Sequence, residues 1–260
     1  MIVPCRDAER SREILSSLGF RQNLQAGGEI ASYQETWTIE NSSGQHSIDL
    51  HRRMNNSEIL SRLFSYDELF SKAQELYALC TGALAIGIVH ALLIACLHRV
   101  SHKHNPYYVG SSEYYGGDRL IWLYDIHLLS AELESNHWSD FAEIAKRKGL
   151  CAICLEGLDK ARSCFATDYP DSVRVALGAH SGVEVPARYY LAGPIKQKWM
   201  DFMAVPGSLK KVKLLREVVF PTTTYMRERY PQASKRWLPW LYAQRALAGV
   251  RKRFTAMRDT

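Results

Sequence analysis

Several patterns that identify common protein classes do not occur in this sequence of 260 residues. No unit of about 20–50 residues is repeated, so a solenoid is not indicated. There is no P-loop and no G-x-S-x-G motif, which argues against a Walker-type ATPase and an α/β-hydrolase. The first residues lack the basic leader and apolar run of a secretory signal, so we expect a cytoplasmic protein.

Cysteine is scarce, with six residues in the chain, so a disulfide-stabilised scaffold is excluded. Cys151 and Cys154 are separated by two residues, but no second pair stands at zinc-ribbon spacing. The two cysteines fall in a helical pattern over residues 150–165, where positions i and i+3 share one face. We therefore expect them to be reduced and buried as small apolar side chains.

Residues 77–97 contain no Asp, Glu, Lys or Arg, and by length alone could cross a bilayer. However, Gly82 and Gly87 interrupt the segment, His90 lies inside it, and no second such segment follows. We interpret it as a short extended piece followed by a buried helix over residues 88–102.

The charge of +6 is unevenly distributed along the chain. Residues 187–260 carry 16 Lys and Arg against 4 Asp and Glu, a net charge of +12, whereas residues 1–186 carry 17 against 23, or −6. Such a basic segment suggests an anionic partner, namely phosphate, nucleic acid or a membrane surface. The alternative is an ordinary solvated surface.

Periodicity predicts an α+β fold. We expect a helix over residues 6–18. Two strands are expected over 33–39 and 46–52, joined by an Asn-Ser-Ser-Gly turn. Together they indicate an α+β domain at 1–76.

The remaining residues have helical periodicity. We expect a helical bundle at 77–180 and a basic C-terminal helical segment at 181–260 that packs on the bundle. Other predicted elements are helices at 57–64, 66–76, 118–133, 138–147, 196–205, 209–219 and 237–254, a loop at 105–117 and a linker at 181–194.

The strongest local signal is the strand Ser47-Ile48-Asp49-Leu50-His51-Arg52. Side chains two positions apart on a strand point to the same face. Asp49 and His51 should therefore project together, while Ile48 and Leu50 point into the core. A carboxylate held on a strand next to apolar neighbours is a common way to fix a divalent metal.

Across most of its length the chain resembles the uncharacterised nucleotidyltransferase family, which is linked to bacterial exopolysaccharide gene clusters. The resemblance rests on the order and spacing of several segments, which are Met1-Ile2-Val3-Pro4, Asp7-Ala8-Glu9-Arg10, Leu15-Ser16-Ser17-Leu18-Gly19-Phe20, Ile48-Asp49-Leu50-His51, residues 92–98 and 119–126, Phe220-Pro221 and residues 225–230. The first looks like the end of the family's "DIDLLVP" strand, and the fourth like its "DLH" strand.

The resemblance implies a polymerase-β-like nucleotidyltransferase fold that transfers NMP from an NTP to an unknown acceptor. Such enzymes hold two Mg²⁺ with three carboxylates on neighbouring strands. Asp49 matches the third carboxylate, and His51 would orient it or contact phosphate. We therefore predict Asp49 and His51 as catalytic residues, with Asp49 as a Mg²⁺ ligand.

The sequence departs from the family pattern at its start. The resemblance places an Asp-x-Asp pair immediately before Met1 and a Gly-Ser or Gly-Gly triphosphate-binding turn further upstream, and neither is in the printed sequence. Gly27-Gly28 follows the wrong strand and is read as a loop. We therefore expect a shortened nucleotidyltransferase-like sheet with weak Mg²⁺ binding, explained either by a misassigned start or by a catalytically dead remnant.

Two further groups of residues have open interpretations. His98 and His102 share a helix face, and we expect them to form a buried polar network with Asp125. The alternatives are the zinc site of a zinc-dependent enzyme, and histidines that are exposed or face a substrate; the Glu of a metalloprotease helix is replaced by Arg99. Basic and aromatic side chains also alternate near the C-terminus, which suits nucleic-acid binding, a membrane surface or simple packing. This second group consists of Tyr225, Arg227, Arg229, Tyr230, Lys235, Arg236, Trp237 and Trp240. Packing is favoured by an apolar stripe that consists of Trp237, Leu238, Trp240, Leu241 and Leu247.

Overall fold

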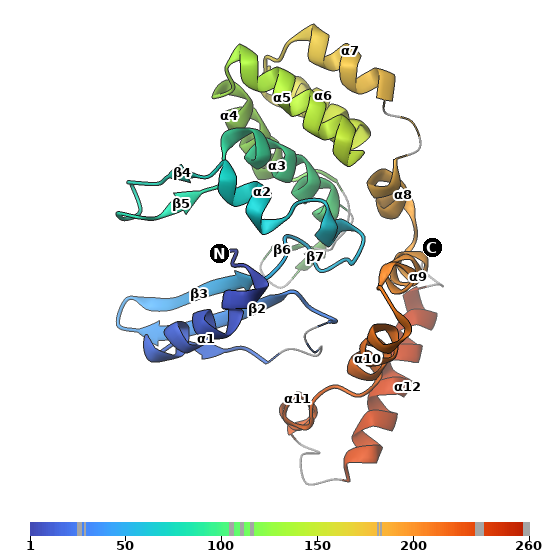
Figure 1. The fold of residues 1–260 in the computed structure, drawn as a ribbon. Coiled ribbons are helices and arrows are strands. Elements are labelled where there is room, and N and C mark those ends of the chain that lie inside the picture. The colour runs from blue at the N-terminus through green and yellow to red at the C-terminus, as the bar shows by residue number, and fades with distance from the viewer. Residues whose placement is uncertain are drawn as a thin grey trace. The chain divides into compact units, whose positions relative to one another are not determined.

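The chain combines many helices with small antiparallel sheets in a computed structural model (Figure 1). The predicted α+β class is therefore confirmed. The structure describes all residues except 25–27, 29, 104–106, 110–111, 115–116, 181, 183, 232–236 and 257–260, and it does not describe the side chains of 107–109, 112–114 and 249–256.

The chain divides into two units, one made of Met1–Tyr66 with Asp201–Thr260 and the other of Asp67–Met200. This division differs from the predicted ranges 1–76, 77–180 and 181–260, because residues from Asp201 onward group with the N-terminal unit.

The first unit contains a three-stranded antiparallel sheet of β1 (Arg21–Gln22), β2 (Gln34–Asn41) and β3 (Gly44–His51), in that order. At the β2–β3 turn Gly44 adopts φ +118°, a conformation that favours glycine. The register places Trp37 opposite Ile48 and Thr36 opposite Asp49. Because side chains alternate along a strand, these two pairs lie on opposite faces of the sheet.

One face of this sheet is covered by α1 (Ala8–Ser17), which follows a 3₁₀ turn at Cys5–Asp7 (Figure 1). Leu15 of α1 is buried with Trp37 and Leu50, and three partly buried side chains pack around this core, namely Val3, Phe20 and Ile48. The helix ends at Ser17, and Gly19 follows with φ +89°. The predicted helix, hairpin and core face are thus confirmed.

The C-terminal part of the first unit is helical. It contains α10 (Ser208–Val219), α11 (Thr223–Arg229) and α12 (Leu238–Ala256). Thr222 caps α11, since its hydroxyl accepts a hydrogen bond from the Tyr225 amide at 3.3 Å. Tyr242 of α12 donates to the carbonyl of Pro221 at 2.7 Å, which ties α12 to the segment between α10 and α11.

The second unit is a helical bundle with two short hairpins. Its elements are α2 (Tyr66–Ser71), β4 (Gln74–Glu75), β5 (Leu84–Ala85), α3 (Ile88–His102), β6 (Tyr107–Val109), β7 (Ser112–Tyr114), α4 (Leu120–Ala131), α5 (Ser135–Lys148), α6 (Cys151–Phe165), α7 (Asp171–His180), α8 (Val185–Leu191) and α9 (Pro194–Ala204), the last of which continues past the unit boundary.

The core of the bundle forms where α3, α4 and α6 meet. Gly157 permits their close approach, because a Cβ there would lie 3.1 Å from the sulfur of Cys96 and 3.3 Å from Ile126 Cδ1. Cys151 and Cys154 are free and buried in α6, as predicted. Among the described residues no helix is long and apolar enough to cross a membrane, which agrees with the interpretation of residues 77–97.

Several predicted elements are wrong. The helix expected at residues 57–64 is only a 3₁₀ turn at Leu60–Arg62, and the helix expected at 66–76 ends at Ser71, before β4. The predicted loop at 105–117 contains the β6–β7 hairpin, and the predicted linker at 181–194 contains α8. Pro186 misled the interpretation, because it stands in the first turn of α8, where proline is tolerated.

Candidate functional site

The face of the sheet opposite α1 carries Asp49 and His51 of β3. Leu50 is fully buried between them, whereas Asp49 is exposed and His51 is half-buried. The hydroxyl of Thr36 on β2 donates to Asp49 Oδ1 at 2.7 Å and fixes the carboxylate. The predicted projection of the two side chains to one face is therefore present.

The surroundings of Asp49 keep its carboxylate ionised. The hydrogen bond from Thr36 lowers the pKa of Asp49, slight burial opposes this, and Gln34, His51 and the amino-terminal charge lower the pKa further. For His51, burial and the amino-terminal charge lower the pKa, while Asp49 acts in the opposite direction. At neutral pH the pair is consequently a carboxylate next to an uncharged imidazole.

The first three residues run alongside β3 in parallel. Ile2 pairs with His51: the His51 amide donates to the Met1 carbonyl at 2.8 Å, and the Val3 amide donates to the His51 carbonyl at 2.9 Å. The amino group of Met1 continues the pattern by donating to the Asp49 carbonyl at 2.8 Å. A residue joined to Met1 in this register would lie opposite Asp49, and its side chain would point to the same face.

The side chains on this face do not by themselves provide enough oxygen ligands for Mg²⁺. Among the described residues no group of three or more His, Cys, Asp and Glu side chains is placed to hold a metal ion. Asp49 contributes one carboxylate, and the charge of the amino terminus acts on it. Because Mg²⁺ prefers several oxygen ligands, we judge that the residues present do not fit a complete magnesium site.

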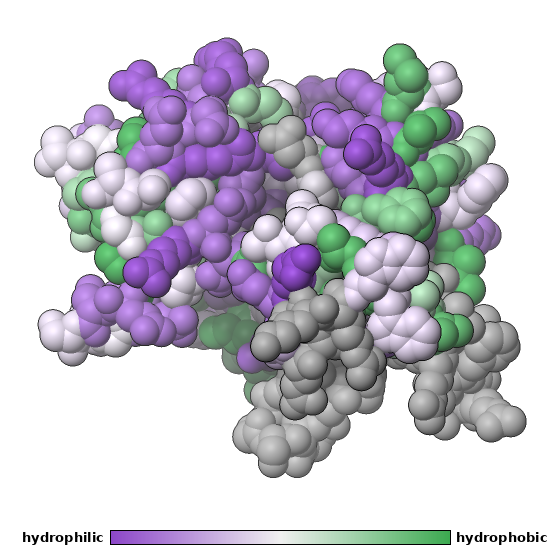
Figure 2. Space-filling model, turned by 90° about the horizontal axis from the view of Figure 1, so that it is seen from below, coloured by the Kyte–Doolittle hydropathy of each residue, from purple (hydrophilic) through white to green (hydrophobic). Residues whose placement is uncertain are grey.

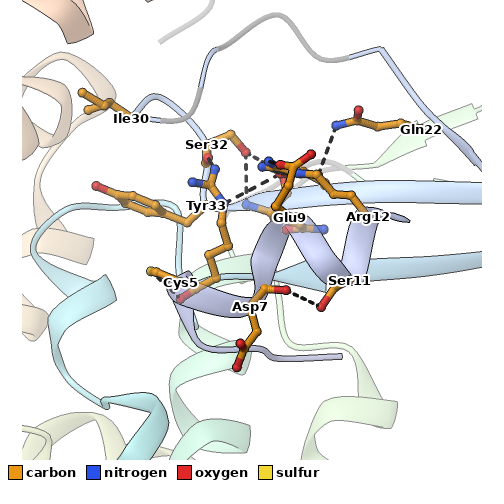
Figure 3. A network of polar contacts seen from close by, with 12 residues as sticks. Cys5, Asp7, Glu9, Ser11, Arg12, Gln22, Ile30, Ser32 and Tyr33 are labelled. Atoms are coloured by element: carbon orange, nitrogen blue, oxygen red, sulfur yellow. Dashed lines mark hydrogen bonds and ion pairs between the residues drawn. The ribbon is translucent and has the colours of Figure 1, made fainter. Parts of the chain in front are cut away.

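A buried ionic network lies on the α1 side of the sheet and was not predicted. Glu35 of β2 is 4% exposed and faces α1. Arg12 of α1 donates to it through Nε at 3.0 Å and through Nη2, and Gln22 donates at 3.2 Å. Figure 3 shows Arg12, Gln22 and Glu9 converging on this network. The only sequence signal is a charged residue at an inward-facing position beside Trp37.

Replacing Glu35 with glutamine is expected to cost about 2 kcal/mol at pH 7, since a charge-assisted hydrogen bond contributes roughly this much. Burial would raise the pKa of Glu35, but the Arg12 hydrogen bond and charge lower it below the usual range. This stability is therefore present above the unfolded-state pKa and disappears as pH falls through the lowered native pKa.

Urea unfolding at pH 7 and at about pH 3 checks this pH dependence. The difference between wild type and Glu35→Gln should shrink in acid. Glu9→Gln is the matched control, because Glu9 contacts the same Arg12 at 2.7 Å but is exposed. Equal effects of the two variants at pH 7 would contradict the role given to Glu35.

His98, His102 and Asp125 do not form a buried polar network; that prediction is wrong, because all three are exposed. The His98 and His102 rings lie 4.5 Å apart, centroid to centroid, and Trp122 lies 6.0 and 5.9 Å from them. Partial burial lowers the pKa of both histidines, so neither favours a proton at neutral pH. His98 and Asp125 line a groove of about 480 Å³ whose other walls are apolar side chains. The described residues provide no support for zinc there.

The C-terminal apolar stripe is only partly buried. Leu241 has no exposed surface, but Trp240 and Leu247 of α12, and Trp237 just before it, are exposed. Lys235 and Arg236 lie outside the described residues. The preference for packing is therefore correct for one side of the helix and wrong for the other.

Comparison with known proteins gives one match. A family model described as "Uncharacterised nucleotidyltransferase" matches residues 1–166, which include α1, the β1–β3 sheet and helices α2 to α6. No curated protein and no solved structure matches the chain.

Proposed function

The chain belongs to the uncharacterised nucleotidyltransferase family, and from this we propose that its reaction class is the transfer of a nucleoside monophosphate from a nucleoside triphosphate to an acceptor. In this reaction an acceptor oxygen attacks the α-phosphorus. The bond from that phosphorus to the bridging oxygen breaks, and pyrophosphate leaves with the bonding electrons.

The observation that carries the proposal is the parallel pairing of Met1–Val3 with β3 beside Asp49. It supports the resemblance of these two segments to neighbouring strands of the family. In the proposal Asp49 supplies one metal-binding carboxylate, whose Oδ1 is held by the Thr36 hydroxyl. His51, uncharged at neutral pH, contacts phosphate as a hydrogen-bonding group.

The 260-residue protein is expected to bind Mg–ATP only weakly, with a Kd of about 1 mM or weaker, because Mg²⁺ depends on more than one anionic ligand. Calorimetry with Mg²⁺ and each of the common NTPs measures this. Asp49→Asn should abolish the residual binding, whereas Glu40→Gln, an exposed carboxylate of the same hairpin, should not. Binding that survives Asp49→Asn would locate the nucleotide elsewhere and overturn the assignment of Asp49.

A second candidate function is a non-catalytic binding module that uses the basic C-terminal helices. The exposure of Trp237 and Trp240, within a segment of net charge +12, favours it. Mutation can distinguish the two candidate functions, because the first depends on Asp49 and the second on side chains of α10 and α12.

A further inference from the structure

Helix α10 presents an apolar stripe to solvent. Leu209 is 85% exposed and Val212 is 64% exposed, and Leu215 and Val219 are each about half exposed. These positions recur at three- and four-residue spacing and so share one side of the helix. No residue of α10 is fully buried.

The opposite side of α10 is attached to its own unit. The Glu217 carboxylate accepts hydrogen bonds from the backbone amides of Ile30 and Ala31, both at 3.0 Å. Lys211 Nζ lies 5.4 Å from the centre of the Phe202 ring. Attachment through this side fixes the helix with its apolar stripe outward.

Helix α12 is arranged in the same way. Its inner side is anchored by Leu241, and Arg245 donates to the Val218 carbonyl of α10 at 2.9 Å. Its outer side carries Trp240, with Trp237 just before the helix; these indoles are 56% and 78% exposed. Figure 2 shows hydrophobic residues among hydrophilic ones on the surface at the right of its view.

The charge around these stripes is strongly positive. Residues 187–260 have 16 basic and 4 acidic residues. Two of the four acids are used internally: Asp201 accepts a hydrogen bond from the buried Ser57, and Glu217 accepts from the two amides named above. Lys213 and Arg216 of α10 follow Leu209 and Val212 by four residues and so flank the apolar stripe; Lys213 Nζ also lies 3.9 Å from the Glu217 carboxylate.

We propose that α10 and the outer side of α12 form a docking surface for an anionic lipid membrane, on which the helices lie parallel to the bilayer plane. Exposed aliphatic side chains enter the headgroup–acyl boundary, tryptophan sits at the interface, and Lys and Arg contact anionic headgroups. This names the partner of the second candidate function and is independent of nucleotidyl transfer.

Charge and chemistry favour an anionic membrane on this surface over a second copy of the chain and over single-stranded nucleic acid. A second copy of the same surface would bring like charges together, which is unfavourable. Single-stranded nucleic acid would use aromatic and basic groups for stacking and phosphate contact, and would leave the aliphatic stripe of α10 without a role.

The test measures co-sedimentation of the full chain with vesicles at about 0.15 M salt. The vesicles contain either phosphatidylcholine alone or phosphatidylcholine with about 30% phosphatidylserine, the anionic component. The wild-type protein should bind the anionic vesicles and shift its tryptophan emission to shorter wavelength. Equal binding to both vesicle types would overturn the part assigned to charge.

The double variant Leu209→Gln/Val212→Gln should weaken partitioning at least tenfold. Leu79→Gln/Val175→Gln is the matched control, because both of its residues are highly exposed and lie in the other unit. Circular dichroism confirms that each variant is folded. An unchanged partition coefficient in the α10 variant would contradict the proposal, and so would tight binding to single-stranded RNA that falls steeply with salt and ignores both α10 substitutions.

Discussion

Replacing Arg99 with methionine is expected to destabilise the Asp67–Met200 unit by about 3 kcal/mol, because removing one partner of a buried ion pair leaves the other uncompensated. Arg99 lies in α3 with no exposed surface. Its Nε and Nη2 donate to the two oxygens of Asp118 at 2.6 and 2.7 Å, and Nη2 also donates to Glu156 of α6 at 3.2 Å. One guanidinium thus joins α3, α6 and the segment before α4.

Urea unfolding of the full chain, followed by amide hydrogen exchange in α3 and α4, measures this effect. Arg147→Met is the matched control, since its pair with Glu143 is exposed at 3.5 Å and should contribute less than about 0.5 kcal/mol. The double variant Arg99→Met/Asp118→Asn should lose less unfolding free energy than the sum of the losses in the two single variants. The reason is that Asp118→Asn removes the charge that Arg99→Met leaves unpaired. A cost for Arg99→Met equal to that of the control would refute the role of the pair.

Local patterns were sufficient where one segment specifies its own conformation. Helix α3 begins after Gly87 and ends at His102, as its apolar run predicted. The alternation around Asp49 correctly predicted which side chains face the core and which face solvent. In each case the spacing of apolar residues along a few turns or one strand carries the information.

Such local patterns do not predict contacts between segments that are far apart in the sequence. The Glu184 carboxylate accepts hydrogen bonds from the amides of Cys151 and Ala152 at 2.9 and 2.8 Å, and so caps α6 from a segment that was interpreted as a linker. Arg12 and Glu35 meet only because α1 folds onto β2.

Periodicity also shows which side of a helix a residue occupies, but not whether another element covers that side. This is why His98 and Asp125 were expected to be buried and are exposed, and why Trp240 and Leu247 of α12 were expected to pack and are exposed. The spacing of apolar residues in an amphipathic helix is the same whether its apolar face packs on the protein core or binds a partner, so spacing alone does not distinguish the two.

Joining Asp-Ile-Asp to the amino group of Met1 is expected to increase the affinity for Mg–ATP at least about tenfold, or 1.4 kcal/mol. In the parallel register that pairs Ile2 with His51, the second added Asp would lie opposite Asp49 and the first opposite Ser47. Side chains at these positions share the face of Asp49. The amide bond would also replace the charged amino group, which now donates to the Asp49 carbonyl.

Calorimetry compares this extended protein with one that carries Asn-Ile-Asn, which has the same length and backbone pairing but lacks the two charges. If clustered carboxylates bind the metal, only the Asp extension raises affinity, and Asp49→Asn in the extended protein removes the gain. Equal affinities of the Asp and Asn extensions would show that the gain comes from completing the strand. A gain that survives Asp49→Asn would show that β3 does not contribute a ligand, and that the parallel pairing of Met1–Val3 with β3 serves the sheet alone.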